Sequence, residues 1–476
     1  MIIGSFVFFL IAFVLIGVAS TRFHDNTTED YLLASQNIKP WLVGFSFFAT
    51  ENSGFMFVGF VGMAYSQGLS AIWLLIGWYV GEVMVLWWTG RQIREQTSAI
   101  KADTYSNLLS RWTGEEYVVV RRLSALIVMV FLGVYGAAQL SAGSKALHVL
   151  MNWEYNTGAF IGFVIVVLYC AAGGIRASIW TDAAQAIVMF ASLIVLTAAG
   201  LANVGGVGVL FDKLEAVDPR LVALYPAELK FGFLPFFLGW LFAGIGVLGQ
   251  AHVMVRFMVI DHARNVRRAL LYYLGMVSVL AVLCLTVGLL CRIALPELAA
   301  GDAELGLPML SAQLLPDVLI GLVLAGLFSA AISTADSQIL SSSAALSRDL
   351  LPQFGEGYLW TKVGTVIVAC IALAIAVSGY NDVFALVTFA WAVMAAGFMP
   401  LLFLLVIGAK PNESQSLMVM LIGIAASLAW HYAGLAEHVY NVLPGILAGF
   451  LTYAVVRGGA SRKEEPHAPA LKAANS

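Results

Sequence analysis

Apolar residues fill the chain in runs of about twenty, and charged or turn-forming residues separate one run from the next. A helix needs about twenty apolar residues to cross the hydrocarbon core of a bilayer. About thirteen such segments can be marked, at 2–20, 40–65, 69–90, 118–150, 155–172, 176–201, 232–255, 266–294, 313–347, 358–378, 381–407, 414–432 and 437–456. The pattern predicts an all-α integral membrane protein with about 13 transmembrane helices.

The composition agrees with a protein that lies almost wholly in lipid. Hydrophobic residues make up 61% of the chain and charged residues 11%, whereas soluble domains contain about 25% charged residues. The first twenty residues lack the basic start of a signal peptide, so we expect them to remain as a spanning helix. No basic patch is interleaved with aromatic residues, which excludes a nucleic-acid partner from our expectations. The expected partners are membrane lipid and a small solute.

Lysine and arginine are distributed unequally between alternate loops. One set of loops and helix ends holds only Lys213, Arg220, Lys230 and Arg292, and the other set holds the remaining basic residues up to the C-terminus apart from Lys145, which lies inside a segment. Because cytoplasmic loops carry the excess of positive charge, this predicts an N-terminus outside the cell and a C-terminus in the cytoplasm. We expect one transmembrane domain over 1–456 in the cell (inner) membrane. Residues 457–476 are charged and contain proline and alanine, so we expect a disordered cytoplasmic tail.

Two of the apolar segments are interrupted by polar residues and glycines. The second segment contains ATENSGF (49–55), and the seventh contains AGIGVLGQAH (243–252). Glycine in membrane helices often serves close packing only. A pair of interruptions five segments apart, however, is typical of inverted-repeat transporters, whose broken helices free backbone groups to bind ions and solute at the membrane midplane. The repeats would then cover about 40–201 and 232–407.

Ionisable residues inside the segments are the second clue to function. A charge at a helix centre costs about 2.5–3.5 kcal/mol on insertion scales, so each one requires a partner or a wet cavity. Glu51, Asp182 and Asp336 all lie beside other polar groups. We expect Lys145 to extend to the outer interface, as long basic side chains do, and Glu82 to pair locally.

The stretch AAISTADSQILSSS (330–343) places hydroxyl groups along one helix face. Ala330, Ser333, Thr334, Ser337 and Ser341 follow helical spacing and share that face. Serine and threonine in membrane helices often bond only to the backbone one turn earlier or hold two helices together. A hard cation needs several oxygen ligands, so an alkali cation also fits this stripe. No histidine or cysteine cluster suggests a transition metal.

Several blocks of the chain, in order, resemble the sodium/solute symporter family, and most closely the bacterial sodium/proline symporters. They are DYLLASQNIKPW (30–41), ATENSGF (49–55), GGIRASIWTDAAQA (173–186), LGQAHVMVRFM (248–258), AAISTADSQILSSSAALSRDL (330–350) and LVTFAWAVMAAGFMP (386–400). The likeness covers nearly the whole chain. It implies an inverted-repeat core like that of the leucine transporter, in segments 2–11. It also implies sodium as the coupling ion and transport in place of enzymatic chemistry.

The resemblance implies a sodium site between the second and ninth segments. Carried over position by position, its ligands would be the backbone carbonyls of Ala49, Asn52 and Ala330 with the hydroxyls of Ser333 and Thr334. The proline symporters have methionine at the position of Asn52, which a backbone ligand tolerates. The sodium ion would be transported together with the solute.

The same resemblance raises the hypothesis of a second cation position. Asp182 matches a family acid linked to sodium-dependent transport, and Asp336 stands where several family members have a neutral residue. Two carboxylates in a low-dielectric site repel each other, so either a cation lies between them or one is protonated. The hypothetical site consists of Asp182, Ser333, Asp336 and Ser337. The alternative is that Asp336 pairs with an amide such as Gln338 or with backbone.

The solute is expected beside the two interruptions. The residues assigned to it are Glu51, Asn52, Ser53, Phe55, Val247 and Gln250. Glu51 stands where the proline symporters have aspartate, and Ala243, Val247 and Ala251 stand where they have Trp, Tyr and Pro. Two rings are therefore missing, which predicts a wider or reshaped pocket.

We expect sodium-coupled import of a small polar organic solute by alternating access, with an amino acid such as proline ranked first. The alternatives are a carboxylate such as pantothenate or a short-chain acid, and a transporter-like channel or sensor. A membrane-embedded enzyme is disfavoured because HExxH and GxSxG motifs are absent from the sequence.

Overall fold

The protein is described here from a computed structural model of the 476-residue chain. The structure describes residues 1–20, 22, 27–227, 229–352, 358–379 and 382–461. Nearly all of these residues are helical, and the described extended backbone pairs at one isolated bridge, between Ile38 and Ile260. The predicted all-α class is confirmed.

Every predicted segment corresponds to a helix or to part of one. The long helices are α1 (Ile2–Ser20), α3 (Pro40–Gly54), α5 (Ile72–Ala99), α7 (Val118–Met151), α8 (Tyr155–Val204), α10 (Phe233–Ile245), α12 (Val266–Ala294), α14 (Asp317–Ala344), α15 (Tyr358–Ala376), α16 (Val383–Val406), α17 (Glu413–Tyr432) and α18 (Val442–Ser461). Helix α3 continues through a π-helical turn, η3 (Phe55–Phe60), into α4 (Val61–Gln67), and α10 continues through η6 (Gly246–Gly249) into α11 (Ala251–Met258). Helix α8 contains two predicted segments, because its backbone breaks at Gly174 with φ 61°.

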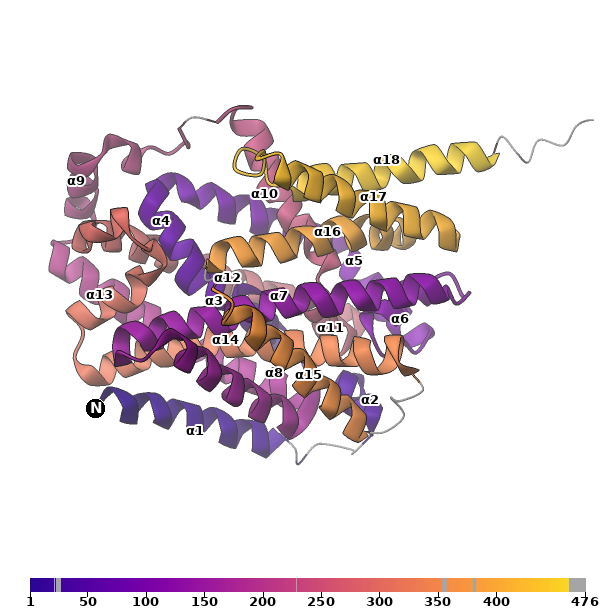
Figure 1. Cartoon of the computed structure of the whole chain (residues 1–476), viewed down its shortest axis with the longest axis horizontal. Coiled ribbons are helices and arrows are strands. Elements are labelled where there is room, and N and C mark those ends of the chain that lie inside the picture. The colour runs from indigo at the N-terminus through magenta and orange to yellow at the C-terminus, as the bar shows by residue number, and fades with distance from the viewer. Residues whose placement is uncertain (21, 23–26, 228, 353–357, 380–381, 462–476) are drawn as a thin grey trace, which may run out of the picture.

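The long helices run side by side along the longest axis of the molecule (Figure 1). The short helices α9 (Val207–Val217) and α13 (Gly306–Leu314) lie at one end, together with the N-terminus. The short helix α6 (Tyr105–Arg111) and the last residues of α18 lie at the opposite end. Helix α14 is central, because it packs against α1, α3, α7, α8 and α15.

The outer surface of the bundle is apolar. Helix α1 presents Phe8 and Leu15, which are 66% and 62% exposed, and other outward-facing helices present large aliphatic residues such as Val282 and Leu451. Side chains of this kind, without polar neighbours of their own, suit the hydrocarbon of a bilayer. They explain why the spanning segments could be found from their apolar runs.

Both predicted interruptions are breaks in the helices. In α3, Ser53 has φ 47° and ψ −178°, a left-handed conformation that side-chain-bearing residues rarely adopt. Helix α10 passes through the 3₁₀ turn η6 to Gln250, which is extended, and the axes of the two parts differ by 59°. Each break removes backbone groups from their helical partners in the middle of the bundle.

The predicted tail is described only in part. Helix α18 runs to Ser461, so the first residues of the stretch from 457 onward are helical. The remaining residues of the predicted tail, 462–476, lie outside the described part of the chain.

Helices α5 and α10 touch backbone to backbone at two glycines. A Cβ atom added at Gly244 would lie 1.8 Å from the carbonyl oxygen of Trp78, and one at Gly81 would lie 2.1 Å from that of Leu241. Small residues allow such close approach between membrane helices. The contact matters because it sets the position of Trp78 and Glu82, which flank the cavity described below.

Substituting Gly244→Val should therefore destabilise the protein. Its side chain would collide with backbone that has no room to move, and overpacking of this kind costs about 1–3 kcal/mol. We expect a lower melting temperature and less monodisperse protein in detergent. Gly275→Val is the control, because a Cβ at Gly275 meets nothing within 4 Å. Equal melting temperatures for the two variants would contradict the close contact.

Candidate functional site

The break in α3 lies against α14, and oxygen atoms from both gather there. The Ser333 hydroxyl lies 2.9 Å from the carbonyl oxygen of Ala49 and 3.1 Å from that of Ala330. The Thr334 hydroxyl lies 2.9 Å from the carbonyl of Thr50, 3.1 Å from that of Ala330 and 3.4 Å from that of Ala49. The structure thus brings together four of the five groups predicted for sodium. All of these residues are buried.

Asn52 is not part of this cluster in any described contact. Its carbonyl accepts the backbone N–H of Phe55. Its side chain donates to the carbonyl of Phe48 at 2.9 Å and accepts from the Tyr79 hydroxyl at 2.9 Å. The carbonyl of Thr50, which the sequence analysis did not single out, takes the place expected for Asn52. Thr50 lies two residues before Asn52 on the same interrupted helix, and this position is the sequence signal that could have indicated its carbonyl as a ligand.

The chemistry of this oxygen cluster fits an alkali cation. It offers three backbone carbonyls, of Ala49, Thr50 and Ala330, and two hydroxyls, all neutral oxygen donors of the kind that hard cations bind. Within the described part of the chain, no group of three or more His, Cys, Asp or Glu side chains could hold a metal ion. Sodium is therefore the cation that this donor set suits, and it would be a transported substrate.

Asp182 lies beside the oxygen cluster and is completely buried. Its Oδ2 atom accepts hydrogen bonds from the hydroxyls of Ser46 at 2.6 Å and Thr50 at 3.4 Å. The same atom forms an ion pair with Arg256 Nη2 at 3.3 Å. Asp182 thus joins α8 to the break in α3 and to α11.

Arg256 is a buried cation that the sequence analysis missed, because it lies one residue beyond the predicted end of the seventh segment. Its guanidinium also donates to the hydroxyls of Ser178 at 3.1 Å, Ser46 at 3.2 Å and Ser337. It is 0% exposed. A long basic side chain at a helix end was counted with the cytoplasmic loops, whereas the structure turns it into the bundle.

The residues of the hypothetical second cation position therefore have a protein cation among them. Ser337 contacts Arg256 and donates to the carbonyl of Ser333 at 2.7 Å. Asp336 is 2% exposed, and its charge acts on Asp182. The structure brings the four predicted residues into one region, with Arg256 next to Asp182 and Ser337. Binding of a second cation there stays a prediction.

A cavity of about 260 Å³ adjoins the other side of the α3 break. It is lined by Glu51, Asn52, Phe55, Met56, Leu75, Trp78, Tyr79 and Tyr135. Three of the six residues predicted for the solute, Glu51, Asn52 and Phe55, are on this wall. The other three, Ser53, Val247 and Gln250, are buried but do not line it.

The aromatic part of the wall comes from α5 and α7, which the sequence analysis did not connect with the solute. Trp78 and Tyr79 line the cavity from α5, which begins after the chain turns at Gly68. Trp78 also packs against Trp391 of α16, with ring centroids 4.6 Å apart and the ring planes tilted by 49°. The Trp391 indole donates to the carbonyl of Ala243 at 2.9 Å. Aromatic rings from α5 and α16 thus pack near Ala243, in the segment that lacks the two aromatic residues of the proline symporters.

Lys145 does not extend to the interface, so that prediction is wrong. It is 5% exposed, and its ammonium lies 2.6 Å from Glu304 Oε2. The same carboxylate accepts the backbone N–H groups of Val383 at 3.0 Å and Phe384 at 2.8 Å, at the start of α16. Burial raises the pKa of Glu304, and Lys145 counteracts it. The Phe384 ring lies 5.3 Å from Phe55, so this ion pair holds α7 and α16 together next to the cavity.

Removing the charge of Arg256 should be strongly destabilising. Arg256→Gln leaves Asp182 buried without a cation, and breaking a buried ion pair in this way costs about 3–5 kcal/mol. The double variant Arg256→Gln with Asp182→Asn should recover part of the loss in a thermal unfolding series. Arg91→Gln is the control, because its pair with Glu95 is exposed and such pairs contribute about 0–1 kcal/mol. A double variant no more stable than Arg256→Gln would rule out the pairing.

Comparison with known proteins gives one consistent result. Residues 31–423 match the sodium:solute symporter family. The chain is 28% identical to the high-affinity proline transporter PutP of Bacillus subtilis (strain 168), over 92% of this chain and 94% of that protein. It is 27% identical to the sodium/proline symporter of Escherichia coli (strain K12), over 94% of this chain and 90% of that protein.

Solved structures agree on the fold. A sodium-coupled sialic acid symporter, in a substrate-bound outward-open state, superposes with a TM-score of 0.81 over 95% of this chain and 97% of its own, at 19% identity. A transporter of the nucleobase-cation-symport-1 family gives 0.58 at 13% identity, over 92% of this chain and 96% of its own. The family match covers most of the chain and agrees with the multi-pass helical fold and the oxygen cluster at the α3 break. The chain belongs to the sodium:solute symporter family, and it is a sodium-coupled solute transporter of the membrane and not an enzyme.

Proposed function

We propose that this symporter imports a small amino acid such as proline, with sodium held by the oxygen cluster and the solute in the 260 Å³ cavity. The observation that carries the proposal is the adjacency of the two sites on one stretch of chain. Ala49 and Thr50 supply carbonyls to the cluster, and Glu51 and Asn52 line the cavity. An ion that orders Ala49 and Thr50 therefore also positions Glu51 and Asn52.

This adjacency provides a physical basis for coupling. Sodium between α3 and α14 would fix the break in the conformation that completes the cavity wall, and so raise the affinity for solute. Linkage requires the solute to raise the affinity for sodium by the same factor. Arg256 already supplies the positive charge beside Asp182, so the proposal needs one sodium ion only.

A second cavity gives sodium and solute a further route. It has a volume of about 450 Å³ and is lined by residues of α14 beyond Ser337, including Leu340 and Ser341, and by Thr104 and Tyr105 near α6. The first cavity is lined by residues at and after the α3 break, and the second by the part of α14 that follows Ser337. Alternating access would open them in turn around the contact between α3 and α14.

The cavity wall favours an amino acid over a simple carboxylate. Glu51 presents an acid to the solute, and three aromatic rings, of Trp78, Tyr79 and Tyr135, line the same space. A positively charged nitrogen is attracted both by a carboxylate and by aromatic faces. Pantothenate or a short-chain acid would bring a second negative charge to Glu51. The names of the relatives, which include proline transporters, point in the same direction.

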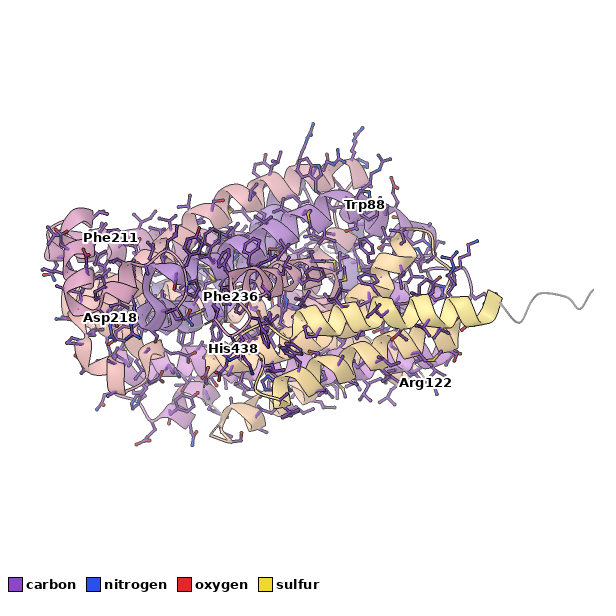
Figure 2. The ribbon with its side chains drawn as sticks, turned by 90° about the horizontal axis from the view of Figure 1, so that it is seen from above. Trp88, Arg122, Phe211, Asp218, Phe236 and His438 are labelled. Atoms are coloured by element: carbon purple, nitrogen blue, oxygen red, sulfur yellow. The ribbon has the colours of Figure 1, made fainter. Side chains whose placement is uncertain are left out.

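We also propose the orientation with the N-terminus outside and the C-terminus in the cytoplasm, in the inner membrane. The N-terminus and the end of α18 lie at opposite ends of the molecule (Figure 1). Figure 2 places Phe211 and Asp218 at one end and Arg122, in the first turns of α7, toward the other. The positive-inside rule assigns the end with Arg122 to the cytoplasm. The repeats proposed over 40–201 and 232–407 would each begin with one of the two broken helices.

Uptake of labelled L-proline into proteoliposomes tests the proposed function. We expect an inward sodium gradient to drive accumulation above the level reached with equal sodium on both sides. Unlabelled amino acids should compete more strongly than pantothenate, because Glu51 disfavours an anion. Stimulation by sodium that is seen only with anionic solutes would refute the amino-acid assignment.

Ser333→Ala and Thr334→Ala should each raise the sodium concentration that gives half-maximal uptake. Each change removes one direct oxygen ligand, whereas a hydroxyl that only joins helices contributes about 0.6 kcal/mol to stability. Ser329→Ala is the matched control, because Ser329 is a buried serine of α14 whose hydroxyl makes no hydrogen bond. If all three variants show the wild-type sodium dependence, the oxygen cluster does not bind sodium.

A further inference from the structure

Two buried acids share one hydroxyl group behind the solute cavity. The Tyr273 hydroxyl of α12 lies 2.5 Å from Glu82 Oε2 of α5 and 3.2 Å from Glu51 Oε2 at the α3 break. Glu82 is 0% exposed and Glu51 is 6% exposed. No lysine, arginine or histidine of the described chain forms an ion pair with either acid.

The number of hydrogen atoms available limits the charge of this group. A tyrosine hydroxyl has one hydrogen to donate, and ionised carboxylates can only accept. Tyr273 can therefore donate to one of the two acids only. The other contact needs a hydrogen that comes from the carboxyl group itself, so one of the two acids is protonated.

The surroundings indicate that the proton is on Glu82. Its Oε1 atom is buried and has no hydrogen-bond partner. An ionised carboxylate with a bare oxygen in such a place is far less favourable than a neutral carboxyl group. Glu51, in contrast, opens onto the cavity, where a charge can be solvated or meet the solute.

The neighbouring helices bring no positive charge to the pair. Helix α10, which packs against α5 next to Glu82, contains no charged or titratable residue. The titratable or charged groups nearest the pair on the other adjacent helices are Tyr79 of α5, Tyr135 of α7, Cys284 of α12, and His252 and Arg256 of α11. The other arginines of α5 and α12 lie near the ends of those helices, and Lys145 of α7 is paired with Glu304. Arg256 is already paired with Asp182. The charge of the acids is therefore reduced by a proton and not by a side chain.

The cavity wall supplies an independent sign of a ligand beside this pair. The indole N–H of Trp78 is buried in the cavity wall close to the Glu51 carboxylate, and its geometry there falls short of a hydrogen bond. It could donate to an acceptor group of the solute, while Glu51 accepts from a donor group. A solute with both a cationic nitrogen and an anionic or carbonyl oxygen satisfies both atoms.

We propose that Glu82 is a resident proton-binding site that positions Glu51 for the solute. The protonated Glu82 carboxyl donates to the Tyr273 oxygen, and Tyr273 donates to Glu51. Glu51 then presents one oriented negative charge to the cationic nitrogen of the solute. The role in transport rests on the proposed function, because that function assigns the cavity to the solute.

Loss of the Glu82 proton should interfere with uptake. Both acids would then compete for the one hydrogen of Tyr273, and two like charges would face each other in a low-dielectric region. Wild-type uptake of labelled L-proline should therefore fall at alkaline pH. Glu82→Gln keeps an uncharged donor for Tyr273, so it should retain uptake and lose this alkaline decline.

Three further variants make the pH measurement specific. Glu82→Ala removes the donor and should lower uptake at every pH, which the conservative Glu82→Gln restores. Tyr273→Phe removes the link and should raise the KM for L-proline. Glu95→Gln, on the exposed part of the same helix, should keep the wild-type pH profile. An alkaline decline in Glu82→Gln identical to that of the wild type would overturn the proposal.

Infrared spectroscopy tests the proton without relying on transport. Purified wild-type protein at neutral pH should show a C=O stretching band of a protonated carboxyl group that is absent from Glu82→Gln and retained in Glu95→Gln. Tyr273→Phe should keep the band and shift it, because the carboxyl loses its hydrogen-bond acceptor. Identical bands in wild type and Glu82→Gln would disprove the resident proton. If the protein shows the expected band change but does not transport L-proline, the proton site on Glu82 is supported and the assignment of L-proline as the solute is refuted.

Discussion

The interrupted helix α3 imposes the constraint on which the rest of the structure depends. Backbone groups that leave their helical partners inside a membrane protein need new partners, because no water is available there. The carbonyls of Ala49 and Thr50 accept hydrogen bonds from the hydroxyls of Ser333 and Thr334 of α14, and the N–H of Gly54 donates to Oε1 of Gln139 of α7. These bonds hold three helices around one point. The same oxygen atoms form the proposed sodium site, and the next turn of chain forms the wall of the cavity proposed for the solute.

Three groups of buried acids near the α3 break are neutralised in different ways. Asp182 has an arginine and several hydroxyl groups. Glu304 has Lys145 and two backbone N–H groups at the start of α16. Glu51 and Glu82 have neither, and share a tyrosine hydroxyl instead. The first two arrangements join helices and stabilise the bundle. The third leaves the Glu51 carboxyl group facing a cavity, where a ligand can supply the missing partner.

The three groups of buried charge lie on different sides of the α3 break and contact different helices. The pair of Asp182 and Arg256 lies on the side of α8 and α11 and fixes Thr50 and Ser337 beside the sodium cluster. The acid pair lies on the side of α5 and α12, next to the solute. The ion pair of Lys145 joins α7 to α16 beside Phe384, which stacks near Phe55 of the cavity wall. Movement of α3 during transport would therefore change the contacts of all three charged groups.

The sequence by itself determined the features that depend on a single helix. The spans follow from the length of each apolar run, the breaks at 49–55 and 243–252 from clustered polar residues and glycines, and the hydroxyl face of α14 from its spacing. The four groups of the proposed sodium site were predicted from the resemblance to the sodium/solute symporter family, which the residues of these local stretches carry. Only the tertiary structure decided the partners of the buried charges. Arg256 is 74 residues from Asp182 and Tyr273 is 191 from Glu82, so these pairs depend on which helix faces which. Close contacts such as that of Gly244 with Trp78 determine which side chains of two helices face each other, because they fix how near the helices approach and how each is rotated.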